Sequence, residues 1–305
     1  MYCNFRTSRN LEDAIEPTDG KKSIAPMLSI AALAIGYVVP PGKAVGPVDT
    51  LTSGLASITR LPYGTDVAQP LRTAAVGSIA EPQLTLYEFE ACPFCRRVRE
   101  MVTYLDLSVV VKPCGRESRH REEVKALAAG EKIRFPYLVD ETAGVSLFES
   151  EDICKHLLKE YGAPRGVTAL PAPPLESLGD DYFLKSTLVT GWMPSVFRFG
   201  RGAAVEDSAR AISAPAAPLV LYNYEGNQFC RLVREALCEL DLPYEARGTA
   251  KGSPRREALQ ELSGKTTAPY LVDPNAGVQM GESADIVAYL WETYGGFVPP
   301  PEPDA

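Results

Sequence analysis

The chain contains one structural unit twice, and this repeat constrains the fold more than any other feature. Residues 84–107 match residues 219–242, 135 positions later, at 13 of 24 positions. Residues 136–162 match residues 269–295, 133 positions later, at 15 of 27 positions. Such dense identity in two segments of the same order indicates duplication of a common unit. We therefore expect two domains of one fold, each with its own hydrophobic core.

The pattern of apolar residues predicts an α/β fold for each copy. In the first copy, residues 84–90 have strand propensity, and residues 93–105 carry apolar side chains at helical spacing. The rest of the copy predicts, in order, a strand at 108–112, a helix at 119–129, a hairpin at 137–148 and a helix at 150–161. The order β-α-β-α-β-β-α predicts a mixed four-stranded sheet with flanking helices in each copy.

The remaining segments set the expected domain boundaries. We expect a leader or flexible extension at 1–49, an N-terminal helical segment at 50–80, the first domain at 81–163, a linker with a helix at 164–215, the second domain at 216–296 and a disordered tail at 297–305. Residues 50–60 align loosely with residues 187–198. Either each segment is a short amphipathic helix that docks on its own domain, or the similarity is chance in Gly/Ser-rich sequence.

Composition narrows the possible partners. The formal net charge is -8 and no cluster of basic residues occurs, so the sequence lacks the electrostatic footprint of a nucleic-acid binder. The apolar stretch Met27–Val39 is shorter than the roughly 20 residues of a membrane-spanning helix. We expect no transmembrane span, while peripheral membrane contact stays open. The stretch belongs either to a targeting leader or to a packed or disordered extension.

A Cys-Pro-Phe-Cys turn carries the clearest chemistry. Cys92 lies where a predicted strand meets a predicted helix, and a helix N-terminus lowers the pKa of a thiol. Arg96 and Arg97, in the next turn, are expected to add to this effect. Cys92 is therefore the candidate nucleophile, and Cys95 is the candidate resolving thiol. The alternatives are an inherited motif that no longer turns over and half of a zinc site, but no second Cys/His pair follows and we predict no metal.

These motifs resemble those of known protein families. The Cys-Pro-Phe-Cys turn, Pro136 after Phe135 and the pair Glu149 and Ser150 resemble glutaredoxins and the N-terminal domains of glutathione transferases. The doubled arrangement, with Trp-Met-Pro at 192–194, looks like tandem thioredoxin-fold proteins of plant and algal chloroplasts. The resemblance implies two thioredoxin-like domains, a location in the chloroplast stroma, and glutathione as co-substrate with a protein or small disulfide.

The resemblance also implies where glutathione binds. A cis-proline loop would face the Cys turn, main-chain groups before the proline would pair with the cysteinyl part of glutathione, and the Glu-Ser pair would hold its γ-glutamyl end. The expected glutathione-binding residues are Phe94, Phe135, Pro136, Glu149 and Ser150 in the first copy, and Asn227, Cys230, Ala268, Pro269, Glu282 and Ser283 in the second.

The second copy departs from the pattern, because Asn227 stands where the first copy has Cys92. This copy is either a binding or structural pseudo-domain or a transferase-type site in which Asn227 hydrogen-bonds a glutathione sulfur. No all-helical domain follows either copy, which disfavours ordinary glutathione conjugation. The sequence predicts a glutathione-linked thiol–disulfide oxidoreductase acting through the first copy. The rival hypothesis is a non-catalytic scaffold or assembly factor.

Overall fold

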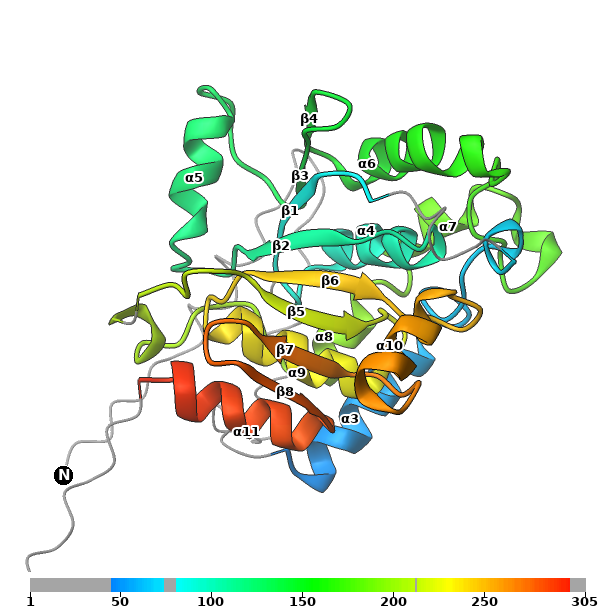
Figure 1. Cartoon of the computed structure of the whole chain (residues 1–305). Helices are drawn as coiled ribbons and strands as arrows, with labels where there is room; N and C mark the ends of the chain where they lie inside the picture. The colour runs from blue at the N-terminus through cyan, green and yellow to red at the C-terminus, as the bar shows by residue number, and fades with distance from the viewer. Residues whose placement is uncertain (1–44, 74–80, 212, 297–305) are drawn as a thin grey trace, which may run out of the picture.

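The computed structural model of the chain describes residues 45–73, 81–211 and 213–296 (Figure 1). The first 44 residues of the expected leader and the expected tail at 297–305 lie outside the described residues. The helix α3 (Pro47–Ile58) precedes the first copy, and the short helices α7 (Tyr182–Lys185) and α8 (Met193–Phe197) lie between the copies.

Both copies have the element order that the sequence predicts. The first copy consists of β1 (Leu84–Glu88), α4 (Pro93–Tyr104), β2 (Val109–Pro113), α5 (His120–Leu127), β3 (Tyr137–Asp140), β4 (Val145–Leu147) and α6 (Ser150–Leu157). The second copy consists of β5 (Leu219–Asn223), α9 (Gln228–Glu239), β6 (Tyr244–Gly248), α10 (Arg255–Ser263), β7 (Tyr270–Asp273), β8 (Val278–Gly281) and α11 (Ser283–Tyr294). Two thioredoxin-like domains follow one another along the chain.

The two expected four-stranded sheets join into one sheet of eight strands, in the order β4-β3-β1-β2-β6-β5-β7-β8 (Figure 1). The joint is an antiparallel pairing of β2 with β6, in which Val110 lies opposite Glu245. Each copy thereby covers the edge strand of the other, and an unpaired edge strand is a site of unwanted association. The predicted sheet is correct for each copy, but the joint between the copies was not predicted.

The core follows from the alternation of side chains along the central strands. Leu84 and Leu86 of β1 are buried together with Val98 and Met101 of α4. The same arrangement recurs in the second copy, where β5 packs with α9. The helix α4 also packs against α6, and α9 packs against α11. The N-terminus of α4 is thereby held over the end of β1, which is where Cys92 lies.

The segments upstream of each copy exchange partners, which corrects the expectation that each docks on its own domain. We call residues 45–67 the first arm and residues 182–205 the second arm. The first arm packs α3 against α9 of the second copy, with Ser53 Oγ donating to the Gln228 carbonyl. The second arm packs on the first copy, with Ser195 Oγ donating to the Ala91 carbonyl.

Equivalent backbone contacts show that the two arms take equivalent places. An isolated parallel bridge joins Asp66 to Lys251, and a second joins Ala204 to Arg116. The similarity between residues 50–60 and 187–198 therefore reflects a shared structural role, and the repeated unit begins before its sheet. Each arm also sends an arginine back to its own copy.

Two glycines permit the close approach of the arms. Gly64 has φ 71° and Gly202 has φ 74°, both in the left-handed region that favours glycine. A Cβ at Gly64 would lie 2.9 Å from the Cβ of Glu225, and a Cβ at Gly202 would lie 2.7 Å from the Cβ of Glu90. Each arm therefore passes directly over a buried glutamate of the opposite copy.

Those glutamates belong to a buried set of charges between the copies, which we call the central ion cluster. Its members are Glu88, Glu90, Arg96 and Arg99 of the first copy and Glu225, Arg231 and Arg234 of the second. Arg99 Nε donates to Glu225 Oε2 at 2.8 Å, and Arg234 Nε donates to Glu90 Oε2 at 3.0 Å. Each of these arginines thus pairs crosswise with the glutamate of the other copy, and also with the glutamate of its own copy, at 3.1 Å for Arg99 and Glu90 and 2.8 Å for Arg234 and Glu225.

Two further buried ion pairs hold the ends of the arms. Arg60 binds Glu100 of α4 through two nitrogens, and Arg198 binds Glu235 of α9 in the same way. Such bidentate pairs fix geometry as well as charge. Arg198 also donates to Asp49 of α3, so the two arms are tied to each other.

We predict that Glu225→Gln lowers the free energy of unfolding by about 3–5 kcal/mol, because it removes one of the buried carboxylates that offset four buried arginines. Denaturant unfolding followed by circular dichroism measures the change. The matched control is Glu151→Gln, which breaks an exposed pair with Lys155 and should leave the midpoint in place. Equal effects of the two substitutions would contradict the role of the central ion cluster.

Candidate active site

Cys92 occupies the position that the sequence predicts, at the N-cap of α4, directly before Pro93. Its Sγ accepts a hydrogen bond from the backbone N–H of Cys95 at 3.3 Å and lies 3.9 Å from the carbonyl oxygen of Phe135. The peptide bond between Phe135 and Pro136 is cis. The Cys turn and the proline loop therefore face each other across Cys92, although 40 residues separate them in sequence.

The two thiols differ in acidity. Burial acts to raise the pKa of Cys92, but hydrogen bonds from the Cys95 thiol and from the backbone N–H groups of Phe94 and Cys95 bring it below its ordinary value. Burial and the neighbouring Cys92 sulfur hold the pKa of Cys95 well above its ordinary value. Cys92 is therefore the better nucleophile, and Cys95 is a protonated thiol beneath it.

The expectation that Arg96 and Arg97 assist Cys92 is wrong. Arg96 joins the central ion cluster and donates to the carbonyl of Gly191 in the second arm. Arg97 donates to Thr187 of the same arm and to Ser150 Oγ. The low pKa of Cys92 thus comes from the end of α4 and from Cys95, and both arginines serve to attach the second arm.

The Glu-Ser pair lies at the start of α6. Ser150 is buried and receives the hydrogen bond from Arg97, which links the start of α6 to α4. Glu149 is exposed, has φ 63° and forms an ion pair with Arg134 in the proline loop. A non-glycine residue in this region of backbone space is uncommon and often marks a functional position. The Cys turn, the proline loop and the start of α6 therefore converge at one end of the sheet.

The second arm forms one wall of this site. Cys92 and Cys95 are buried in an apolar cluster with Phe89, Ala91 and Cys238, and Phe94, Phe135 and Ala203 pack against it. Ala203 belongs to the second arm, and its carbonyl accepts a hydrogen bond from the backbone N–H of Arg116. Only 5% of Cys92 is exposed. Access to its sulfur is therefore narrow.

The second copy reproduces this geometry without a thiol at its centre. Asn227 caps α9, with Oδ1 accepting from the N–H groups of Phe229 and Cys230 at 2.8 and 3.1 Å. Its Nδ2 donates to the carbonyl of Ala268 at 3.2 Å, before the cis bond to Pro269. The Asn227 amide lies between the start of α9 and the proline loop, as Cys92 lies between the start of α4 and the proline loop in the first copy. It hydrogen-bonds both of these segments.

The other second-copy residues lie where the repeat places them. Cys230 is fully buried, and burial raises its pKa to about 12. Glu282 is exposed with φ 64°, and Ser283 is buried at the start of α11. Position 267, which matches Arg134, is Thr267, so Glu282 lacks the arginine that Glu149 has. The second copy thus keeps the cis-proline loop and the start of the last helix, but among its described residues it has no accessible thiol between them.

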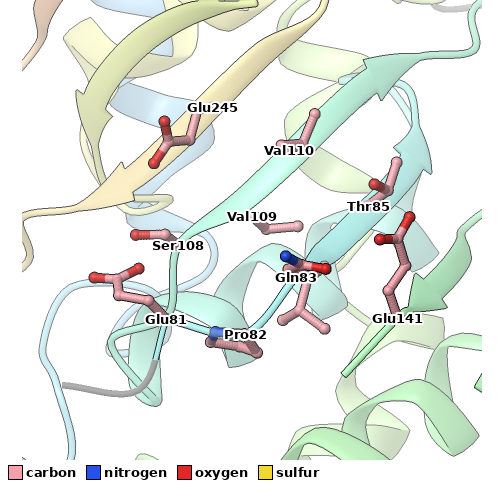
Figure 2. A pocket seen from close by; sticks show the side chains of 10 residues that line it. Glu81, Pro82, Gln83, Thr85, Ser108, Val109, Val110, Glu141 and Glu245 are labelled. Carbon is pink, nitrogen blue, oxygen red and sulfur yellow. The ribbon is translucent and has the colours of Figure 1, made fainter. Parts of the chain in front are cut away.

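An open pocket of about 390 Å³ lies at the opposite end of β1 from Cys92 (Figure 2). Figure 2 shows Glu81, Glu141 and Glu245 around it, beside Thr85. Glu81 and Glu245 already form ion pairs with arginines of the second copy. An acidic pocket does not suit the two carboxylates of glutathione, so it is no part of the candidate site.

Three site features escaped the sequence analysis. Arg134 pairs with Glu149, Arg121 lies over the ring of Phe135 at 5.1 Å, and the second arm supplies Ala203. The repeat does contain a signal for one of them, since Arg121 matches Arg256 at a shift of 135. Across the described ranges, no group of three or more His, Cys, Asp and Glu side chains is placed to hold a metal ion.

Comparison with protein families decides the classification. The model of the glutathione S-transferase N-terminal domain matches residues 86–165 and again residues 221–300. The chain belongs to this family. Both members of the tandem carry the family's thioredoxin fold, so the glutathione transferase N-terminal domain occurs here twice.

Comparisons with curated proteins and with solved structures add little to this classification. A search of curated proteins finds no match. Among solved structures, the chain is similar to TDR1 of Leishmania, which is described as a unique trimeric glutathione transferase. The two sequences are 18% identical and the TM-score is 0.22. The match covers 69% of this chain and 68% of that one. In the part of the chain that the structure describes, none of the helices is long and apolar enough to cross a membrane.

We predict that Cys92 reacts with a small alkylating agent at lower pH than free cysteine, whose pKa is about 8.5. The reason is that the thiolate, stabilised at the end of α4, is the reacting form. Peptide mapping by mass spectrometry across a pH series measures the midpoint. Cys230 is the control and should stay unmodified over the same range, because its pKa is about 12. A Cys92 midpoint at or above that of free cysteine would contradict the prediction.

Proposed function

We propose that the protein is a glutathione-linked thiol–disulfide oxidoreductase of glutaredoxin type, located in the chloroplast stroma, and that it works through its first copy. The observation that carries the proposal is the setting of Cys92, which lies between the N–H of Cys95 and the carbonyl of Phe135 with a lowered pKa. The location rests on the resemblance to tandem chloroplast proteins.

The residues around Cys92 suit glutathione. The main chain of Phe135 lies beside Cys92 and offers backbone groups to the cysteinyl part of the tripeptide. The start of α6, with Ser150 and Glu149, offers a helix N-terminus to the γ-glutamyl carboxylate. Arg121, over the ring of Phe135, and Arg134, which pairs with Glu149, bring two guanidinium groups to the site, and these groups suit the carboxylates of an anionic peptide.

The reaction begins with the Cys92 thiolate attacking the glutathione sulfur of a mixed disulfide. A bond forms between Cys92 and that sulfur, the original disulfide bond breaks, and the substrate leaves as a thiolate that takes a proton from water. A second glutathione thiolate then attacks the same glutathione sulfur, and Cys92 leaves as a thiolate while oxidised glutathione departs. Alternatively, Cys95 loses its proton and attacks Cys92, which releases glutathione and leaves a Cys92–Cys95 disulfide for later reduction.

The second copy contributes binding or support in this proposal. It retains the proline loop at Ala268 and Pro269 and the pair Glu282 and Ser283, but Asn227 forms no disulfide. The Asn227 amide also supplies an internal bridge, which stabilises the copy in the absence of any ligand. Transferase-type chemistry through Asn227 is less favoured, since its amide bonds both α9 and the proline loop.

One observation favours a second candidate function. The joined sheet, the exchanged arms and the central ion cluster fix the two copies as one rigid pair. A rigid pair of thioredoxin folds suits a scaffold or assembly factor that holds a protein partner. Activity measurements separate this candidate from the oxidoreductase.

We predict that the full-length protein reduces a small glutathione mixed disulfide in an assay coupled to glutathione reductase. Cys92→Ser should lower the rate to background, because no other thiol occupies the nucleophile position. Cys95→Ser should retain part of the rate, since glutathione replaces the resolving thiol. Cys154→Ser, a buried cysteine on α6, is the control and should keep the full rate. Wild-type protein with no rate above background would favour the scaffold.

We predict further that oxidised glutathione adds one glutathionyl group to the Cys95→Ser protein, at Cys92 and not at Cys230. The reason is that Cys230 is fully buried and protonated at neutral pH. Glu282→Ala should weaken only non-covalent glutathione binding by the second copy. Peptide mapping and calorimetry measure the two effects. A glutathionyl group found mainly on Cys230 would show that the active copy is assigned wrongly.

A further inference from the structure

The helix α3, at the periphery of the molecule (Figure 1), turns its large apolar side chains outward. Four of them are exposed, Val48 by 40%, Leu51 by 65%, Leu55 by 41% and Ile58 by 64%. Successive members are three or four residues apart, so they lie along one side of the helix and form what we call the α3 stripe. A contiguous apolar surface on a folded protein marks a docking site.

The attachment of α3 does not use the stripe. The buried residues of the helix are Asp49, Ser53 and Ala56, which are polar or small. Ser53 donates to the Gln228 carbonyl of the second copy, and Asp49 accepts from Arg198 of the second arm. The helix is therefore held through its polar side, and the stripe is left for another occupant.

The sequence just before α3 contains an apolar segment that can reach the stripe. Residues 27–39 are nearly all apolar and include no charged side chain. The seven residues 40–46 join this segment to α3, and seven extended residues span about 23 Å. The helix has 12 residues and is therefore about 18 Å long. The connection is thus long enough for the segment to lie against any part of the stripe.

We propose that residues 27–39 dock on the α3 stripe of their own chain. Both surfaces are uncharged, because the single charged side chain of α3 is Asp49, on its buried side. A short tether holds a segment at an effective concentration of about millimolar, which favours it over a second copy of the chain. A membrane surface is a poorer occupant, since membrane-surface helices carry Lys and Arg beside their apolar face and α3 has neither. The inference is independent of the proposed function.

The test is limited proteolysis of the full-length chain with chymotrypsin, followed by mass spectrometry of cleavage after Leu33 and Tyr37. Cleavage in the wild-type protein should be at least about tenfold slower than in a free peptide of residues 27–39, because a docked segment must detach before it is cut. The double variant Leu51→Glu and Ile58→Glu places two charges on the stripe and should raise cleavage to the rate of the peptide. The matched control is Leu262→Glu, a leucine of α10 that is 42% exposed, which should leave cleavage slow.

Other occupants of the stripe would give different results. Rapid cleavage in the wild-type protein, or slow cleavage retained in the double variant, overturns the proposal. Sedimentation distinguishes the remaining cases. A wild-type dimer that the double variant converts to a monomer, with rapid cleavage in both, would assign the stripe to a second copy. Wild-type protein that sediments with phosphatidylcholine vesicles, while the double variant does not, would assign it to a membrane.

A reciprocal variant keeps the proposal testable if the double variant does not fold. Ile30→Glu with Ile35→Glu changes the segment and leaves every described residue in place. It should raise cleavage after Tyr37 to the rate of the free peptide. It should also raise the fluorescence of a dye that binds apolar surfaces, because the stripe is uncovered. Slow cleavage or unchanged fluorescence in this variant overturns the docking.

Discussion

The crosswise pairing of buried charges between α4 and α9 is the interaction on which the rest of this structure depends. Four arginines and three glutamates lie between the copies, and the arginines of each helix pair with a glutamate that precedes the helix of the other copy. Each copy alone would lose part of this pairing, Arg96 and Arg99 their contact with Glu225, and removing one partner of a buried ion pair is strongly unfavourable. The cluster therefore fixes the distance and register of the copies. The pairing of β2 with β6 and the paths of the arms follow from that placement.

The candidate site of the first copy is consequently built from both halves of the chain. The end of α4 and the Phe135 carbonyl come from the first copy, while the wall at Ala203 comes from the second arm. In glutathione transferases the helical domain supplies the pocket for the second substrate. Here the second arm packs beside Cys92 through Ala203, and little of Cys92 is exposed.

The sequence predicted the elements of each copy well but not their assembly. Local patterns determine a strand, a turn and a helix, so Cys92 at the start of α4 and the proline loop at Pro136 were predictable from spacing and resemblance. The arginines were misassigned, because Arg96 and Arg97 are close to Cys92 in sequence while their partners, Glu225 and Thr187, are about 90 to 130 positions away. Contacts of that range depend on how whole copies pack, and no pattern within one copy encodes them.

The exchange of arms also determines how this chain can fold. The contacts of Ser53 with Gln228 and of Arg198 with Asp49 join residues more than 140 positions apart, so neither copy completes its surface until most of the chain has been synthesised. Contacts of such long range slow folding, because the entropy of closing the loop is lost before the contact is gained. The first half leaves the ribosome without Glu225, which pairs with Arg96 and Arg99, and without Arg231 and Arg234, which pair with Glu90. We therefore expect the two halves to reach the native state together, as one cooperative unit.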